Sequence, residues 1–389
     1  RDSSRGQEKM IEKYYDGAIE QVAAGLGTVE KNHLLVRYSG QFSVENLNDT
    51  KQLEKNEDIF VQVHEFETGE ITCAYEPYLT MICDGFRRYM TGTFEEFMET
   101  CDVYYLHRPV LLGYFNQDNT GREEIILLDE VAYEQERMLA ALERMLCAIA
   151  DRHPVLFVLN RFQLASKSTM QLTARFLKCE NCNIGLVLGV SDIQAMPEFL
   201  VPDWEMLYET LDDGSKIYHI GNSGRKKEET IDDEKYVDYG SEKVYRKLQN
   251  MVEFLDFDQA AYYLETIDRK IKFDNLLVDD AARFRMWLLF VKVSILRQDI
   301  PKALEICEDL EKIHLAGKEE ECAYEQDYLI ATAYMYQGKL KEALEMAGET
   351  YRIAGKMSDD YRMFLSELLE AKIQMSGWYN IFFCAQDVK

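Results

Sequence analysis

Short apolar runs alternate with longer helical patterns from the start of the chain to about position 220. The apolar runs predict five β-strands, at residues 33–38, 59–63, 154–159, 184–189 and 216–220. Between them, residues 78–89 and 134–149 carry apolar side chains at three- and four-residue spacing, which predicts helices with one apolar face. In the second helix this face holds Met138, Leu139, Leu142, Met145, Leu146 and Ile149. This alternation predicts an α/β fold with a mainly parallel sheet.

After about position 240 only helical spacing remains, and the pattern repeats. The segment 295–305 aligns with 335–345, and 375–383 falls in the same register, which gives a repeat of about 40 residues. Small Ala303 and Ala343 open the second helix of each unit, and Gly338 and Gly377 lie in the turns before it. This arrangement resembles the long form of the tetratricopeptide repeat, which implies stacked helical hairpins that bind proteins. The alternative is an ordinary helical bundle.

A polar, glycine-containing run at residues 221–234 separates the two patterns. We therefore expect an α/β domain at 1–222, a linker at 223–240 and helical repeats at 241–389. An earlier repeat unit is expected around residues 254–261, in a slipped register. Because the last unit is incomplete, the chain is expected to continue with more repeats, and an apolar end favours self-association.

Charge and composition exclude several classes of partner. The chain has 44 Lys and Arg against 70 Asp and Glu, a net charge of −26, so phosphate backbones repel it and direct nucleic-acid binding is not expected. No apolar run approaches the roughly 18 residues of a membrane helix, so no membrane association is expected. Nine scattered cysteines form no disulfide framework and indicate a reducing cytoplasm. Cys179 and Cys182 have metal-site spacing, but no second pair completes a tetrahedral site, so no metal is expected.

The stretch from 152 to 177 carries the strongest motif. An apolar strand ends in Asn160 and Arg161, a short turn follows, and a helix then begins with Ser and Thr. This layout resembles the Walker B region of the STAND class of signal-transduction ATPases, in which the strand ends in two acidic residues. The resemblance extends over about residues 5–222 and implies a P-loop NTPase-like parallel sheet, but here the acidic pair is replaced.

The resemblance places the phosphate-binding loop at residues 40–47. A working loop needs G-x-x-x-x-G-K-[ST], in which glycines, a lysine and a hydroxyl hold phosphate and magnesium. From Gly40 onward this chain has Glu45, Asn46 and Leu47 at the last three of those positions. We therefore expect no hydrolysis and no ATP or magnesium cofactor. The alternative is an ordinary strand-to-helix turn with no relation to nucleotides.

The resulting hypothesis is a non-enzymatic regulatory or scaffolding fragment of a larger signalling protein. It joins a degenerate STAND-like domain to repeats that bind a protein or peptide. Partner contacts are expected on the concave face at Tyr324, Tyr328 and Tyr334, although these tyrosines fit core packing as well. One alternative is an active ATP-binding switch with a transcriptional or diguanylate cyclase output outside this chain. Another is a helical-repeat adaptor whose first domain is purely structural.

Overall fold

The computed structural model describes residues 2–28, 33–38, 44, 58–67, 69–117, 131–179, 183–191, 196–212, 216–220, 238–274 and 276–384. The chain forms two compact units. Unit 1 comprises Arg1–Val237 together with Glu253–Asp256, and unit 2 comprises Asp238–Val252 and Phe257–Lys389. The predicted boundaries placed Glu253–Asp256 with the repeats, whereas these residues pack in unit 1.

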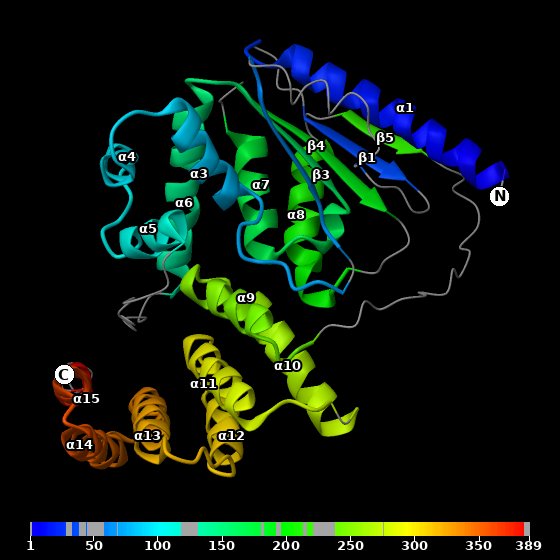
Figure 1. Cartoon of the computed structure of the whole chain (residues 1–389). Coiled ribbons are helices and arrows are strands. Elements are labelled where there is room, and N and C mark those ends of the chain that lie inside the picture. Colours follow the sequence, from blue (N-terminus) through cyan, green and yellow to red (C-terminus); the bar gives the residue numbers. More distant parts are fainter. Residues whose placement is uncertain are drawn as a thin grey trace. The chain divides into compact units, whose positions relative to one another are not determined.

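Unit 1 is built on a parallel sheet of five strands, and all five predicted strands are confirmed. They are β1 (Leu34–Tyr38), β2 (Phe60–Glu65), β3 (Val155–Asn160), β4 (Ile184–Ser191) and β5 (Lys216–Ile220). Their order across the sheet is β2-β3-β4-β1-β5, so β1 lies between β4 and β5 (Figure 1). Because every pairing is parallel, the carboxyl ends of the strands lie at one edge of the sheet.

Helices cover both faces of this sheet, as the near-continuous apolar strands require. Helix α1 (Asp2–Gly25) packs on one face, against β1, β3 and β4. Gly185 and Gly189 of β4 point toward it, and a side chain at Gly185 would lie 2.5 Å from Val22 of α1. Two glycines at these positions of a central strand therefore allow α1 to approach the sheet closely.

The opposite face carries the helices α3 (Tyr78–Tyr89), α6 (Val131–Ala150), α7 (Lys167–Lys178) and α8 (Val201–Asp212) (Figure 1). The predicted apolar face of α6 is confirmed, since all six of its residues are buried in this core. Helix α3 begins directly after Pro77, and the ring of its first residue, Tyr78, packs edge-on against Phe157 of β3. Two short helices, α4 (Phe94–Thr100) and α5 (Arg108–Asn116), and the turns Phe162–Leu164 and Glu198–Leu200 complete the described part of the unit.

Unit 2 is entirely helical in its described residues. Its helices are α9 (Glu242–Glu253), α10 (Phe257–Phe273), α11 (Asp280–Leu296), α12 (Ile300–Leu310), α13 (Glu319–Tyr336), α14 (Leu340–Met357) and α15 (Asp360–Cys384). Short turns join α9 to α10, α11 to α12 and α13 to α14, and the helices of the last two pairs pack on each other. The predicted helix pairs after position 240 are therefore present.

The turns inside these pairs share one backbone feature. Each has a residue in the left-handed region: Leu255 at φ 64°, Gln298 at φ 62° and Gly338 at φ 79°. Gln298 and Gly338 are equivalent in the repeat register. Leu255 comes slightly before the equivalent position, 258, in agreement with the slipped register expected for the first unit.

The expected turn at Gly377 is wrong, because α15 runs through this position as one helix. In the repeat register, the residue equivalent to Gly338 is Trp378, and Gly377 comes one position too early. Trp378 lacks the ready access of glycine to the left-handed conformation, which favours continuation of the helix. None of the helices in the described residues is both long and apolar enough to cross a membrane.

Candidate functional site

The carboxyl edge of the sheet brings together residues from three elements. The hydroxyl of Tyr38, at the end of β1, donates a hydrogen bond of 2.7 Å to Oδ1 of Asn160, at the end of β3. Both residues are buried, and β4 lies between their strands. The bond is accommodated at Gly189, where a Cβ atom would lie 2.5 Å from Asn160 Oδ1 and closer still to the hydroxyl of Tyr15.

Glu65, the last residue of β2, is the carboxylate of this edge. Its Oε1 lies 3.3 Å from a guanidinium nitrogen of Arg161, and its Oε2 accepts a hydrogen bond of 3.1 Å from the backbone N–H of Val44. Arg161 directly follows β3 and has a left-handed backbone, with φ 53°. The carboxylate of Glu65 thus pairs with the Arg161 cation and accepts a hydrogen bond from a loop amide at the sheet edge.

Burial controls the titration of the two phenols at this edge. It raises the pKa of Tyr38 well above the ordinary value, although the Arg161 charge and the hydrogen bond to Asn160 lower it in part. Burial also raises the pKa of Tyr15, and the neighbouring Tyr38 and Glu65 add to the effect. Burial therefore favours the neutral form of both phenols.

The turn after β3 is held by side-chain contacts to the backbone. The amide of Gln163 donates to the carbonyl of Ser191 at 3.2 Å, and its Oε1 accepts from the N–H of the same residue at 3.4 Å. Ser166 then caps α7, because its hydroxyl accepts from the N–H of Thr169. The polar residues of this motif are thus engaged in positioning the strand, the turn and the helix.

The structure agrees in part with the sequence predictions for this edge. Asn160 and Arg161 lie together at the carboxyl edge, as their place after a strand implies. Gly40, Glu45, Asn46 and Leu47 lie outside the described residues. Tyr15, Tyr38 and Glu65 were missed, and the signal that could have found the last two is their position at the ends of predicted strands.

The described residues do not fit a magnesium–triphosphate group. Magnesium is usually held by carboxylates and phosphate oxygens, yet Oδ1 of Asn160 accepts from Tyr38 and the carboxylate of Glu65 is bound to Arg161 and Val44. Among the residues that the structure describes, no cluster of three or more His, Cys, Asp or Glu side chains could hold a metal ion.

The cysteine of the Cys-x-x-Cys pattern has a different neighbour. Sγ of Cys179, at the end of α7, lies 3.6 Å from Sγ of Cys147 on α6, and Cys182 is outside the described residues. The hydrogen bond with Cys179 is the main cause that raises the pKa of the Cys147 thiol, followed by burial. A raised pKa disfavours the reactive thiolate at Cys147.

The three tyrosines proposed for partner binding lie in unit 2. Tyr324 is buried, and its hydroxyl donates to the carbonyl of Arg362 on α15 at 3.0 Å. Tyr328 and Tyr334 are half-buried in the packing of α13 against α14 and α15. For Tyr324 the structure therefore corrects the expectation of an open binding side chain in favour of the alternative, core packing between helices.

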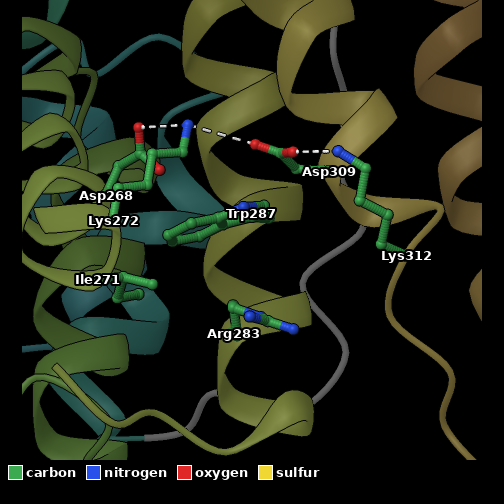
Figure 2. Close-up of a pocket in the computed structure, with 7 residues that line it drawn as sticks. All are labelled: Asp268, Ile271, Lys272, Arg283, Trp287, Asp309 and Lys312. Carbon is green, nitrogen blue, oxygen red and sulfur yellow. Dashed lines mark hydrogen bonds and ion pairs between the residues drawn. The ribbon is translucent and has the colours of Figure 1, made fainter. Parts of the chain in front are cut away.

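A small cavity of about 140 Å³ lies between α10, α11 and α12 (Figure 2). Trp287 and Ile271 provide its apolar wall, and its charged lining residues are Asp268, Lys272, Arg283, Asp309 and Lys312. The buried Nε of Arg283 has no hydrogen-bond partner in the part of the chain that the structure describes.

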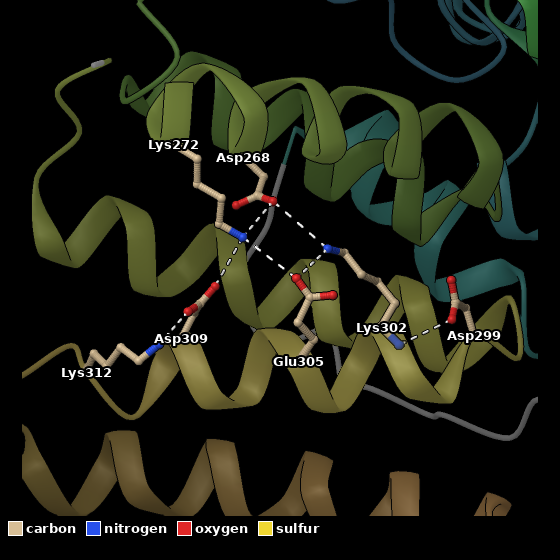
Figure 3. A network of polar contacts seen from close by, with 7 residues as sticks. All are labelled: Asp268, Lys272, Asp299, Lys302, Glu305, Asp309 and Lys312. Carbon is tan, nitrogen blue, oxygen red and sulfur yellow. Dashed lines mark hydrogen bonds and ion pairs between the residues drawn. The ribbon is translucent and has the colours of Figure 1, made fainter. Parts of the chain in front are cut away.

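Most charges around this cavity neutralise one another. Lys272 lies 3.1 Å from Asp268, 3.3 Å from Asp309 and 3.8 Å from Glu305, so one ammonium group links α10 to α12 (Figure 3). Lys312 pairs with Asp309 at 2.8 Å, and Lys302 with Glu305 at 3.1 Å. Such a network stabilises the packing of helices rather than a reaction.

Comparisons of the chain with protein-family models, with curated proteins and with solved structures found no match.

Proposed function

We propose that this chain is a non-enzymatic regulatory or scaffolding component of a signalling protein. Unit 1 is a STAND-like, P-loop-derived domain that has lost nucleotide hydrolysis, and unit 2 is a tetratricopeptide-like array that binds a protein partner. One observation carries the first half: Glu65 places a carboxylate on Arg161 and on the Val44 N–H, where a phosphate-binding site would need both groups for its ligand.

The topology of the sheet supports this assignment. Open α/β sheets bind ligands beyond the carboxyl ends of their strands, at the point where the strand order reverses. Here β2, β3 and β4 lie on one side of β1, and β5 lies on its other side. The strand order therefore reverses at β1, which ends at Tyr38. The paired polar groups of Tyr38, Asn160, Glu65 and Arg161 occupy the position where such a domain would hold its nucleotide.

The repeats support the second half. Turns with a left-handed residue recur at Gln298 and Gly338, and the small residues Ala303 and Ala343, which follow them in the same register, are both fully buried between helices. Repeated helical hairpins stack into extended surfaces that are widely used for protein binding.

The nucleotide half is tested by titrating the full chain with a fluorescent ATP analogue and magnesium, and by measuring phosphate release. We expect neither saturable binding nor turnover. Glu65→Gln removes the competing carboxylate and is expected to gain weak analogue binding, whereas the matched control Glu67→Gln, an exposed residue of the same segment, is not.

Micromolar, magnesium-dependent binding of the analogue by the unaltered chain would contradict the proposal. That result would favour the alternative, an active ATP-binding switch.

A further inference from the structure

Two half-buried cysteine thiols meet between neighbouring helices of unit 1. Cys147 lies on α6, Cys179 ends α7, and their Sγ atoms are 3.6 Å apart. A disulfide bond has a length of about 2.05 Å, so the two sulfur atoms need to approach each other by about 1.5 Å. The pair is therefore one small local adjustment away from a covalent link between the two helices.

An ion pair one helical turn away holds the two thiols opposite each other. Arg175 of α7 donates to the carboxylate of Glu143 on α6 at 2.7 Å, and each of these residues precedes its cysteine by four positions. Residues four positions apart lie on the same face of a helix. The ion pair and the thiol pair thus bridge the same two helix faces, so the register that brings the sulfur atoms together is supported by a contact outside the pair.

Burial sets this pair apart from three other thiols in the described part of the chain. Cys83, Cys101 and Cys307 are buried, and burial is the main cause that raises their pKa values to about 12, 11 and 12. A thiol that keeps its proton is a poor nucleophile, because the thiolate is the reactive form. A small oxidant reaches the half-buried pair more readily than these three buried thiols.

The hydrogen bond within the pair gives the two sulfur atoms different roles. It is the main cause that raises the pKa of Cys147, so Cys147 keeps its proton. The S–H of Cys147 then donates to the sulfur of Cys179, and a hydrogen bond to the charged form stabilises a thiolate there. Cys179 is therefore the sulfur that reacts first, and Cys147 is the neighbouring thiol that completes the bond.

We propose that Cys147 and Cys179 form a reversible redox pair, which hydrogen peroxide oxidises to a disulfide between α6 and α7. The sulfur of Cys179 attacks one peroxide oxygen, so that an S–O bond forms, the O–O bond breaks and the other oxygen leaves as water with the Cys179 proton. The sulfur of Cys147 then attacks this sulfenic acid, so that the S–S bond forms, the S–O bond breaks and a second water leaves with the Cys147 proton. The two thiols have lost two electrons to one peroxide molecule.

The disulfide ties α6 to the end of α7, the helix that follows the turn after Asn160 and Arg161. Disulfides that form in a reducing compartment are usually transient and serve redox sensing or catalysis. A dithiol reductant restores both thiols by exchange, which makes the link reversible. The inference is independent of the function proposed above, because neither a nucleotide nor a partner protein takes part in it.

The test maps the disulfide in the full chain by mass spectrometry. The reduced protein is treated with a small molar excess of hydrogen peroxide, and the remaining thiols are blocked with N-ethylmaleimide. The protein is then digested, without reduction, by trypsin and a glutamate-specific protease. Cleavage after Glu180 separates Cys179 from Cys182, so a bond from Cys147 and a bond within the Cys-x-x-Cys pattern give different peptides. We expect peptide 145–152 linked to peptide 179–180 as the main cross-link, and we expect dithiothreitol to remove it.

The variant Cys147→Ser is expected to lose this cross-link. The matched control, Cys322→Ser, removes another half-buried thiol, on α13, and is expected to leave the cross-link unchanged. Four outcomes overturn the inference: no cross-link, a main bond between Cys179 and Cys182, a sulfinic acid at Cys179 in place of the bond, or oxidation of Cys322 as extensive as that of Cys179. All four are read from the unaltered chain, so a folding defect in either variant does not obscure the result.

Discussion

The hydroxyl of Tyr38 reaches across β4 to Oδ1 of Asn160, which lies two strands away in the sheet. The backbone of β4 passes beneath this hydrogen bond at Gly189, where a side chain would collide with Asn160 and Tyr15 together. Two polar residues and a glycine, far apart in the sequence, thus form one arrangement at the edge where the nucleotide motifs were expected.

Gly189→Ala is expected to destabilise unit 1 by about 1–3 kcal/mol, because the new methyl group forces Asn160 and Tyr15 away from their positions. Urea unfolding, followed by far-UV circular dichroism, measures the change. The control is Gly355→Ala in α14, where a Cβ atom meets nothing within 4 Å; it is expected to stabilise the chain by up to about 1 kcal/mol. Equal effects of the two substitutions would contradict the close contact at Gly189.

Tyr38→Phe is expected to cost about 1 kcal/mol, because it removes one hydrogen bond to the buried amide of Asn160 while it keeps the ring. Urea midpoints compare this variant with Tyr14→Phe, whose side chain is half-exposed on α1 and whose loss of a hydroxyl is expected to have little effect. A Tyr38→Phe variant as stable as the control would show that the bond across β4 contributes nothing.

Lys272→Met is expected to destabilise unit 2 by up to about 1 kcal/mol, since it removes the one cation that lies beside Asp268, Asp309 and Glu305 together. The effect should shrink in about 1 M salt, which screens the repulsion of these carboxylates. Lys341→Met serves as the control, because Lys341 is highly exposed and reaches Glu345 only at 3.9 Å. Chemical denaturation with urea at low and high salt tests the difference.

Asp327→Asn is expected to stabilise the chain near pH 8 and to have no effect near pH 3. Burial, with repulsion from Glu349 and Glu311, raises the pKa of Asp327 to about 6, from 3.8. The folded chain therefore binds this proton more tightly than the unfolded chain does. The loss of folding stability caused by the Asp327 charge is therefore absent below about pH 4. It grows as the pH rises and is complete above about pH 6.

Thermal midpoints of Asp327→Asn and the unaltered chain across this range give the difference directly. Effects of titrating groups that do not interact with Asp327 cancel in the comparison. A difference independent of pH would mean that the Asp327 carboxylate is not destabilised in the fold.

Apolar spacing along the chain was enough to predict its strands and the buried face of one helix. All five strands and the buried face of α6 follow from it, because a strand or a helix buries side chains at a period set by its own backbone. The equivalence of Ala303 and Ala343 was also readable, since equivalent packing positions require similar side chains. Asn160 and Arg161 were found for the same reason: they end an apolar strand.

Which residues meet depends on the tertiary structure. Tyr38 contacts Asn160 only because the strand order places β1 and β3 on either side of β4, and no local pattern encodes that order. Likewise, Glu253–Asp256 pack with unit 1, where Phe254 is buried in the core beside Tyr75, although their sequence reads as part of the helical array. Helix α15 also runs through Gly377, where the repeat pattern predicts a turn. Spacing sets the period of each element, whereas long-range packing selects its neighbours.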